Sequence, residues 1–223
     1  MISKLVSPFK QGNGAIILGS CNDLVCIQVQ EKFYIYNPST GFSNTLCNKD
    51  FLEHFRSTAT RRRRCVEMSP LYHGFGYVSA TDDYKFVVAI GCSPNGEVAI
   101  FSLRDNVWKW VKAPCDYSNY DAMSPHGALL NEAMHWFYNP PPNEQCICAF
   151  DLAKEEFRVM PLPVISEADK FDLCFEYLGV LEGCLSLSRW KSRGSCVNHG
   201  IICSSSTSCI TYRSSYLKVV ALW

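Results

Sequence analysis

The feature that most restricts the fold is a strand, an acidic turn and a second strand at Gly74–Val88, which recurs in weaker copies along the chain. The stretch reads GFGYVSATDDYKFVV. Phe75 and Tyr77 alternate with other residues before the turn, and Tyr84 and Phe86 alternate after it. Alternation with period two predicts β-strands, and a turn this short joins only antiparallel strands. The stretch therefore predicts an antiparallel hairpin.

The copies of this hairpin follow a regular spacing. Their turns begin at Asn22, Asp82, Asn131 and Glu182, which are 60, 49 and 51 residues apart. Further short strands follow each hairpin, so we expect four-stranded antiparallel units at about 14–46, 74–111, 127–160 and 178–188. A period near fifty residues with four strands per unit is typical of kelch-type blades. A β-sandwich is the rival, but it requires no fixed interval.

These units predict an all-β fold, a kelch-like β-propeller that is incomplete, because only part of a fourth blade is present. We expect this domain to occupy residues 1–188. Residues 189–223 are rich in Ser and Cys and form a divergent tail.

The predicted blade turns use residues with special backbone properties. Glycine permits positive φ, proline presets φ, and Asn or Asp side chains bond nearby amides. Adjacent Asp82 and Asp83 are carboxylates of the kind used in acid/base work or cation binding, but neighbouring side chains diverge, so we expect them to bond turn amides. The residues given a structural role in the turns are Gly19, Asn22, Asn37, Pro38, Gly74, Gly76, Asp82, Asp83, Asn131, Asp151 and Gly183.

Composition restricts the class of protein and partner. Lys plus Arg and Asp plus Glu both number 21, so the formal net charge is zero. No long-range electrostatic attraction to nucleic acid or a membrane surface is therefore expected. No apolar run reaches the roughly 18 residues needed to cross a bilayer. The 13 cysteines are scattered, and no signal peptide or N-glycosylation site is evident. We expect reduced thiols and a cytoplasmic or nuclear location.

Signals for catalysis or metal binding are sparse, and no cofactor is expected. No nucleophile elbow, phosphate loop or His-Glu-x-x-His motif occurs. A small propeller enzyme using His135 or Asp83 is an alternative reading, although neither residue has an identifiable partner in the sequence. Cys146 and Cys148 lie two apart and share a strand face, which permits metal ligation. A second candidate metal set has the spacing C-x2-H-x3-C-x5-C but lacks a Cys-x2-Cys knuckle; it comprises Cys196, His199, Cys203 and Cys209.

Loops on a rigid β scaffold are the best candidates for recognition. The run Arg61–Arg64 is either a nuclear-localisation or phosphate-binding patch or, as we prefer, a solvated loop between units. The candidate partner-binding residues are Tyr117, Tyr120, Pro140, Pro141 and Pro142.

Several segments resemble, in order, the F-box-associated domain of plant F-box/kelch-repeat proteins. They include GSCNDLVCI from Gly19, YIYNPST from Tyr34, GFGYVSATDDYK from Gly74, VAIFSLRDNVWK from Val98 and ICAFDLAKEEFRVMPLP from Ile147. The resemblance implies a protein-interaction module, non-catalytic itself, that captures proteins for ubiquitination by an SCF-type (cullin-RING) ligase.

The resemblance also implies where the chain departs from the family. The F-box, which normally precedes GSCN, is not in the sequence, so binding to a Skp-type adaptor and a cullin is expected only if an F-box is present elsewhere. The family pattern of strands also stops after Leu187. A truncated, mis-spliced or frame-shifted product, and hence a non-functional remnant, is therefore a further alternative.

Overall fold

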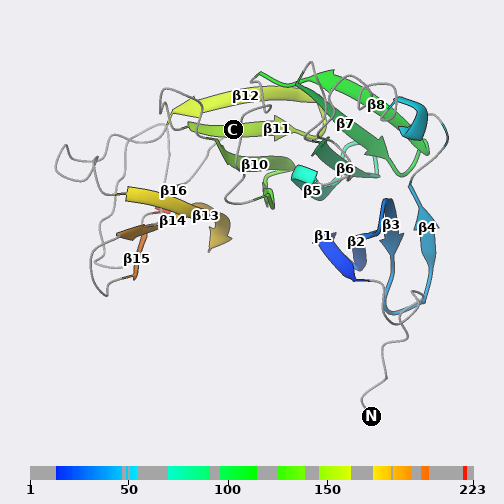
Figure 1. Ribbon diagram of the computed structural model, residues 1–223, viewed down its shortest axis with the longest axis horizontal. Helices are drawn as coiled ribbons and strands as arrows, with labels where there is room; N and C mark the ends of the chain where they lie inside the picture. The colour runs from blue at the N-terminus through cyan, green and yellow to red at the C-terminus, as the bar shows by residue number, and fades with distance from the viewer. Residues whose placement is uncertain are drawn as a thin grey trace, which may run out of the picture. The chain divides into compact units, whose positions relative to one another are not determined.

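The computed structural model describes residues 14–46, 49, 51–54, 70–90, 96–114, 125–138, 146–161, 173–181, 183–191, 197–200 and 218–219. The chain divides into two compact units, Met1–Asn119 and Tyr120–Trp223. Each unit contains two four-stranded sheets (Figure 1). Within the described ranges, no helical segment has the length and apolar character of a membrane-crossing helix.

The first unit begins with a sheet in which consecutive strands are antiparallel neighbours, in the order β1-β2-β3-β4. These strands are β1 (Ala15–Cys21), β2 (Leu24–Val29), β3 (Lys32–Tyr36) and β4 (Ser43–Thr45). The second sheet repeats the plan in the order β5-β6-β7-β8. Its strands are β5 (Pro70–Val78), β6 (Asp83–Ile90), β7 (Glu97–Ser102) and β8 (Val107–Lys112).

A β-bulge in β1 links the two sheets of this unit. The register of β1 against β2 shifts between Ile17 and Gly19, so Leu18 has no opposite residue on β2. The ring Nδ1 of His73, on β5, lies 2.7 Å from the Leu18 carbonyl oxygen. A carbonyl can only accept, so Nδ1 carries the proton and donates it. The buried His73 ring thus bonds the carbonyl that the bulge removes from regular pairing.

Aromatic rings fill the core of the first unit. Phe33, on β3, is fully buried, with its ring centroid 5.2 Å from that of Phe86 and 6.5 Å from that of Trp108. The alternation predicted for the strand after Asp83 places Phe86 and Val88 in this core. The core is therefore built from one face of each sheet.

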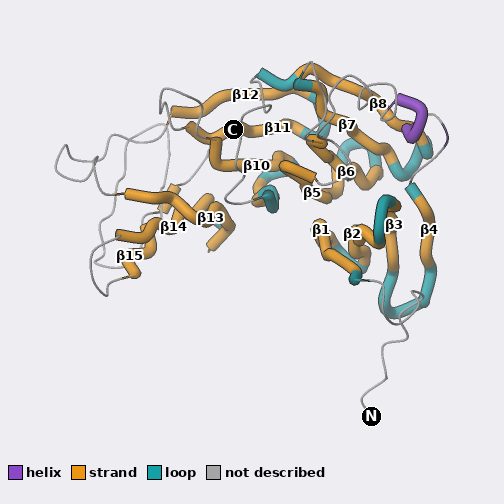
Figure 2. Tube along the Cα trace, in the orientation of Figure 1, coloured by secondary structure: helices purple, strands orange, loops and turns teal. Residues whose placement is uncertain are grey.

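A short helical segment, residues 51–54, packs against β8; Figure 2 draws it in purple. The Phe51 ring lies 4.2 Å from that of Trp108, and the His54 ring stacks 3.9 Å from that of Trp110. His54 Nε2 also lies 3.3 Å from a carboxylate oxygen of Glu97. These contacts anchor the start of the segment that connects the first sheet to the second.

The second unit follows the same plan. Its first sheet has the order β9-β10-β11-β12, formed by β9 (Ala128–Leu130), β10 (Ala133–Tyr138), β11 (Cys146–Asp151) and β12 (Glu156–Pro161). In its second sheet, β14 pairs with three strands. The strands are β13 (Leu173–Leu181), β14 (Cys184–Lys191), β15 (Val197–Gly200) and β16 (Lys218–Val219). Phe137, Ile147 and Leu178 belong to one buried cluster of this unit.

The predicted all-β fold of repeated four-stranded antiparallel units is confirmed. Several bounds differ from expectation; for example, the first strand of the fourth repeat starts at Leu173 and not at Leu178. The first strand of the sheet β5-β6-β7-β8 starts at Pro70 and not at Gly74, and proline is tolerated there because it is the first residue of the strand. The expected domain boundary at residue 188 lies inside β14, and β15 and β16 continue that sheet. Strands pair through main-chain groups, which every composition offers. The composition of residues 189–223 therefore did not predict β15 and β16.

Gly127, just before β9, has no room for a side chain. A Cβ there would lie 2.7 Å from Met134 Cε and 2.8 Å from Trp136 Nε1. We predict that Gly127→Ala lowers the free energy of unfolding by about 1–3 kcal/mol, because the buried Trp136 ring must move. Gly14→Ala is the control, since no atom lies within 4 Å of its Cβ position. Urea unfolding measures both variants, and equal stabilities would show that the ring moves freely.

Candidate interaction surface at the hairpin turns

Each of the four aligned turns contains a residue with positive φ. Asn22 has φ 52°, Asp82 50°, Asn131 50° and Gly183 70°. Left-handed backbone is tolerated by glycine and, among other residues, best by Asn and Asp. The residue types at these turns therefore follow from the backbone that each hairpin needs.

Three of the glycines assigned to turns lie inside strands. Gly19 is in β1, and Gly74 and Gly76 are in β5. Gly19 instead permits close approach of the two strands, because a Cβ there would lie 3.0 Å from the Cβ of Phe75. The turn assignment was wrong for these positions, since a glycine beside a turn and a glycine within a strand look alike in sequence.

The turn between β3 and β4 is closed by the Asn37 side chain. Its Oδ1 accepts hydrogen bonds from the amides of Ser39, at 2.9 Å, and Thr40, at 3.0 Å. Pro38 lies within the turn, and Gly41 has φ 75°. This is the Asx arrangement that the sequence predicted.

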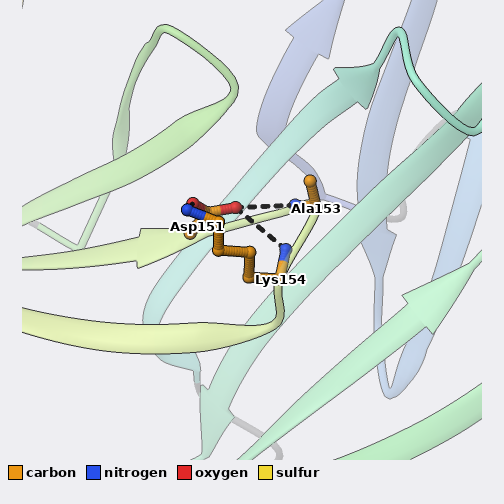
Figure 3. Close-up of polar contacts among 3 residues, drawn as sticks. All are labelled: Asp151, Ala153 and Lys154. Carbon is orange, nitrogen blue, oxygen red and sulfur yellow. Dashed lines mark hydrogen bonds and ion pairs between the residues drawn. The ribbon is translucent and has the colours of Figure 1, made fainter. Parts of the chain in front are cut away.

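Asp151 closes the turn between β11 and β12 in the same way (Figure 3). Its Oδ1 accepts from the amides of Ala153, at 3.0 Å, and Lys154, at 2.9 Å. The Lys154 ammonium lies 3.6 Å from Oδ2 of the same carboxylate. The residue before β12, Glu155, has φ 57°. The carboxylate thus holds the turn that leads into the last strand of this sheet.

We predict that Asp151→Ala lowers the free energy of unfolding by about 1 kcal/mol, because two turn amides lose their acceptor. Asp151→Asn keeps the Oδ1 acceptor and should cost less than half as much. Thermal unfolding ranks the two variants, and faster amide exchange at Ala153 and Lys154 locates the effect. An equal loss for both variants would mean that the charge, and not the acceptor, stabilises the turn.

The two adjacent aspartates act in different places. Asp83 is 4% exposed, and its carboxylate accepts from the Ser102 hydroxyl at 2.7 Å and from the Arg104 amide at 2.9 Å. Asp82 is exposed and accepts from the Tyr77 hydroxyl at 2.8 Å. Asp83 therefore bonds the turn between β7 and β8, whereas the side chain of Asp82 bonds a hydroxyl of β5. The prediction that the pair bonds turn amides holds for Asp83, at the β7–β8 turn, because the start of β6 directs its side chain inward; the contact of Asp82 is with a hydroxyl instead.

Side chains also connect neighbouring turns of the first unit. Asn22 Nδ2 donates to the Tyr84 hydroxyl at 2.9 Å, which joins the β1–β2 turn to the start of β6. The Tyr84 ring lies 4.9 Å from that of Tyr77. The Arg104 guanidinium donates to the Thr81 carbonyl. The turns at this end of the unit are thus held by side-chain contacts, which favours a preorganised surface for binding.

The candidate general base, His135, is buried. Its side chain is 0% exposed, and Nδ1 donates to the Ala128 carbonyl at 3.2 Å. Burial lowers the pKa of this imidazole below its ordinary value of 6.5. Full burial argues against proton transfer to a substrate from solvent.

The lowered pKa of His135 predicts a pH dependence of stability. Between the folded pKa and the unfolded pKa, the unfolded chain binds a proton that the folded chain does not. Stability should therefore fall as the pH drops below about 6.5, by up to about 1.4 kcal/mol per pH unit. His135→Gln removes the titration but keeps a donor for Ala128. Urea unfolding at several pH values should give a flatter profile for the variant, and identical slopes would contradict the assignment.

The candidate cysteines carry no assembled metal site among the described residues. Cys146 and Cys148 lie on β11, the first half-buried and the second buried. Within the described residues, no group of three or more His, Cys, Asp and Glu side chains is placed to hold a metal ion. His199 lies on β15, of which only the backbone is described. The remaining candidates lie outside the described residues; they are Cys196, Cys203, Cys209, Tyr117, Tyr120, Pro140, Pro141, Pro142 and Arg61–Arg64.

Comparison with known families now adds to this geometry. A family described as "F-box associated beta propeller domain" matches residues 3–194. The chain belongs to this F-box-associated family. Its Arabidopsis thaliana relatives include F-box protein CPR1, which is 28% identical over 83% of this chain and 48% of its own length. F-box/kelch-repeat protein At3g23880 is 28% identical over 77% of this chain and 44% of its own.

The chain thus spans about half the length of the curated relatives it matches. The family assignment confirms the resemblance inferred from the ordered segments, and the family itself is described as a β-propeller domain. Among solved structures, a chain of the Mitotic Checkpoint Complex aligns over 88% of this F-box-associated chain and 57% of its own length, with 12% identity and a TM-score of 0.42.

Sequence reasoning missed the side chains that connect the turns. The sequence did not indicate the partners of Ser102 and Tyr84, because Asp83 lies 19 residues from Ser102 and Asn22 lies 62 residues from Tyr84. Of the side chains that connect the turns, only Asp83 was expected to bond turn amides, because it lies beside a turn in the sequence. Such contacts depend on how strands are placed side by side, which a local pattern does not encode.

Proposed function

We propose that this chain is a protein-interaction module that selects proteins for ubiquitination by an SCF-type, cullin-RING ligase, and that it is not itself an enzyme. The observation that carries the proposal is the family match over residues 3–194, together with relatives that are F-box proteins. The ligase's other subunits would perform ubiquitin transfer. The chain would supply affinity for the protein to be modified.

The geometry supports a binding role. Short hairpins present their turns on rigid four-stranded sheets, and side chains such as Asn22 and Asp83 hold those turns in place. Rigid loops lose little conformational freedom on binding, which favours affinity. The chain's equal numbers of acidic and basic residues suit a protein partner better than nucleic acid.

The partners in this proposal follow from the family. A protein substrate binds the chain directly, whereas a Skp-type adaptor and cullin require an F-box. We propose that the chain works in the cytoplasm or the nucleus.

Affinity capture from plant extract tests the proposal. The chain is compared with a version that carries an upstream F-box from a relative such as CPR1. We expect both versions to recover a common protein, and only the longer version to recover adaptor and cullin. Failure of the F-box version to recover a protein beyond the adaptor and cullin would contradict a role in substrate recognition.

If the chain is instead an enzyme, the purified protein should convert a substrate and should not retain a bound partner protein. Loss of a measured turnover on changing His135 to Gln or Asp83 to Asn, with folding retained, would favour that alternative.

A further inference from the structure

The β1–β4 sheet packs on the β5–β8 sheet through one of its two faces. We call this the front face; it includes Cys26 and Phe33, which belong to the aromatic core of the first unit. The opposite face, the rear face, carries a separate apolar cluster of Ile27, Val29 and Tyr36. Among the described strands of this unit there is no third sheet that packs on the rear face.

The β5–β8 sheet shows how a rear face of this kind is covered. In both sheets a row of paired residues crosses the first three strands of the rear face. The row is Ile17, Ile27 and Tyr34 in one sheet and Phe75, Phe86 and Phe101 in the other. The front face of β1–β4 packs on the second row, where Phe75 is 2% exposed. Ile17, at the matching position of the first row, is 61% exposed.

The rear face of the β1–β4 sheet has the composition of a protein interface. Exposed hydroxyl residues end its rows, with Ser20 on β1 and Ser43 and Thr45 on β4. Of the residues that strand pairing places on this face, only Lys32 is charged. Apolar patches with a polar rim mark sites of protein association. A face with so little charge fits an uncharged partner surface, because burying an unpaired charge is costly.

A front face of the same kind occurs in the second unit. In the first unit, Cys21 and Leu24 close the β1–β2 turn and pack on the front-face core. The pair that closes the β13–β14 turn is Leu181 and Cys184, so these two residues lie on the front face of the β13–β16 sheet. Leu185, on the rear face, belongs to the buried cluster shared with the β9–β12 sheet. Leu181 is 43% exposed, and β13–β16 is the last of the described sheets.

We propose that two copies of the chain associate head to tail, with the rear face of the β1–β4 sheet of one copy against the front face of the β13–β16 sheet of the other. In each unit the front face of the first sheet already packs on the rear face of the second. The same packing between copies would cover Ile17 and Leu181 together. Because the copies are identical, a closed pair makes this contact twice. The inference does not depend on the proposed function.

The size of the contact favours a pair that makes it twice. Four strands about 4.8 Å apart, each with about six residues at about 3.3 Å per residue, give a face of roughly 380 Å². One contact then buries roughly 760 Å² over both copies, and two contacts bury roughly 1,500 Å², whereas stable interfaces need about 1,200 Å² or more. A single contact between two β1–β4 sheets would fall short of this size.

Sedimentation of the full chain over a range of concentrations tests the proposal. We expect an equilibrium between monomer and dimer. Ile17→Lys and Leu181→Lys should each weaken the dimer at least about tenfold, because each variant places a charge in both contacts of the pair. Val107→Lys is the control and should leave the equilibrium unchanged, because Val107 is an exposed valine (41%) on β8, outside both faces. All three positions are exposed, so urea unfolding should show that the variants remain folded.

A mixture of the two variants tests the head-to-tail arrangement itself. Each variant keeps one undamaged face, so a mixed pair can form one undamaged contact, whereas a pair of either variant alone forms none. We therefore expect the mixture of Ile17→Lys and Leu181→Lys to associate more tightly than either variant alone.

Three results would overturn the proposal. The first is a chain that stays monomeric at every concentration, and slow amide exchange of β1 in that monomer would show that the rear face is covered within one chain. The second is a dimer that Val107→Lys weakens as much as the other two variants do. The third is a dimer that Ile17→Lys weakens and Leu181→Lys does not, without recovery in the mixture, which would assign the contact to two β1–β4 sheets.

Discussion

Phe33→Ala should lower the free energy of unfolding of the first unit by about 3–5 kcal/mol. The Phe33 ring is fully buried and lies 5.2 Å from that of Phe86, 5.9 Å from that of Phe51 and 6.5 Å from that of Trp108. Removing it leaves a cavity where both sheets of the unit meet. Amide exchange of β3 and β6 measures the loss for this unit alone.

Phe42→Ala is the control for this prediction. Phe42 lies just before β4 and is 54% exposed, so its removal should change stability by no more than about 0.5 kcal/mol. Similar losses for Phe33 and Phe42 would show that the aromatic cluster is not the core of the unit. A single cooperative transition in the unmodified chain would also argue against the reading of the chain as a non-functional remnant.

Asp83→Ala should lower the free energy of unfolding by about 2–3 kcal/mol, because the Ser102 hydroxyl and the Arg104 amide lose a buried acceptor. The same change should loosen the turn between β7 and β8. Urea unfolding gives the stability, and exchange of the Arg104 amide reports on the turn.

Asp82→Asn serves as the comparison, because it changes the neighbouring exposed carboxylate while keeping a residue that tolerates positive φ. We expect a loss below about 0.5 kcal/mol, since an amide oxygen can still accept from the Tyr77 hydroxyl. A larger loss for Asp82→Asn than for Asp83→Ala would reverse the roles assigned to the two carboxylates.

The strands and first turns were predictable because their signals are local. Alternating aromatic residues such as Tyr84 and Phe86 mark strands within a few residues, and turns such as that at Asn22 need residues that accept positive φ. Because the hairpin recurs at a regular interval, four units could be predicted from the pattern of one. Several short segments resemble those of a known family and occur in the same order. They predicted the family, and the family match confirms that prediction.

Contacts between hairpins were less predictable. The hydrogen bond of His73 to Leu18 depends on a bulge, and the stacking of His54 on Trp110 depends on where a connecting segment lies. Neither has a periodic signal.

The proposed function of the chain is to select proteins for ubiquitination. Its most direct test is ubiquitin transfer in a reconstituted cullin-RING ligase, with the chain joined to an F-box and with the protein captured from plant extract as substrate. We predict ubiquitin conjugates on that protein with the F-box version, and none with the chain alone or with an F-box version carrying Phe33→Ala under conditions that unfold this variant. A captured protein that stays unmodified when the F-box version is assembled with an active ligase would contradict the claim.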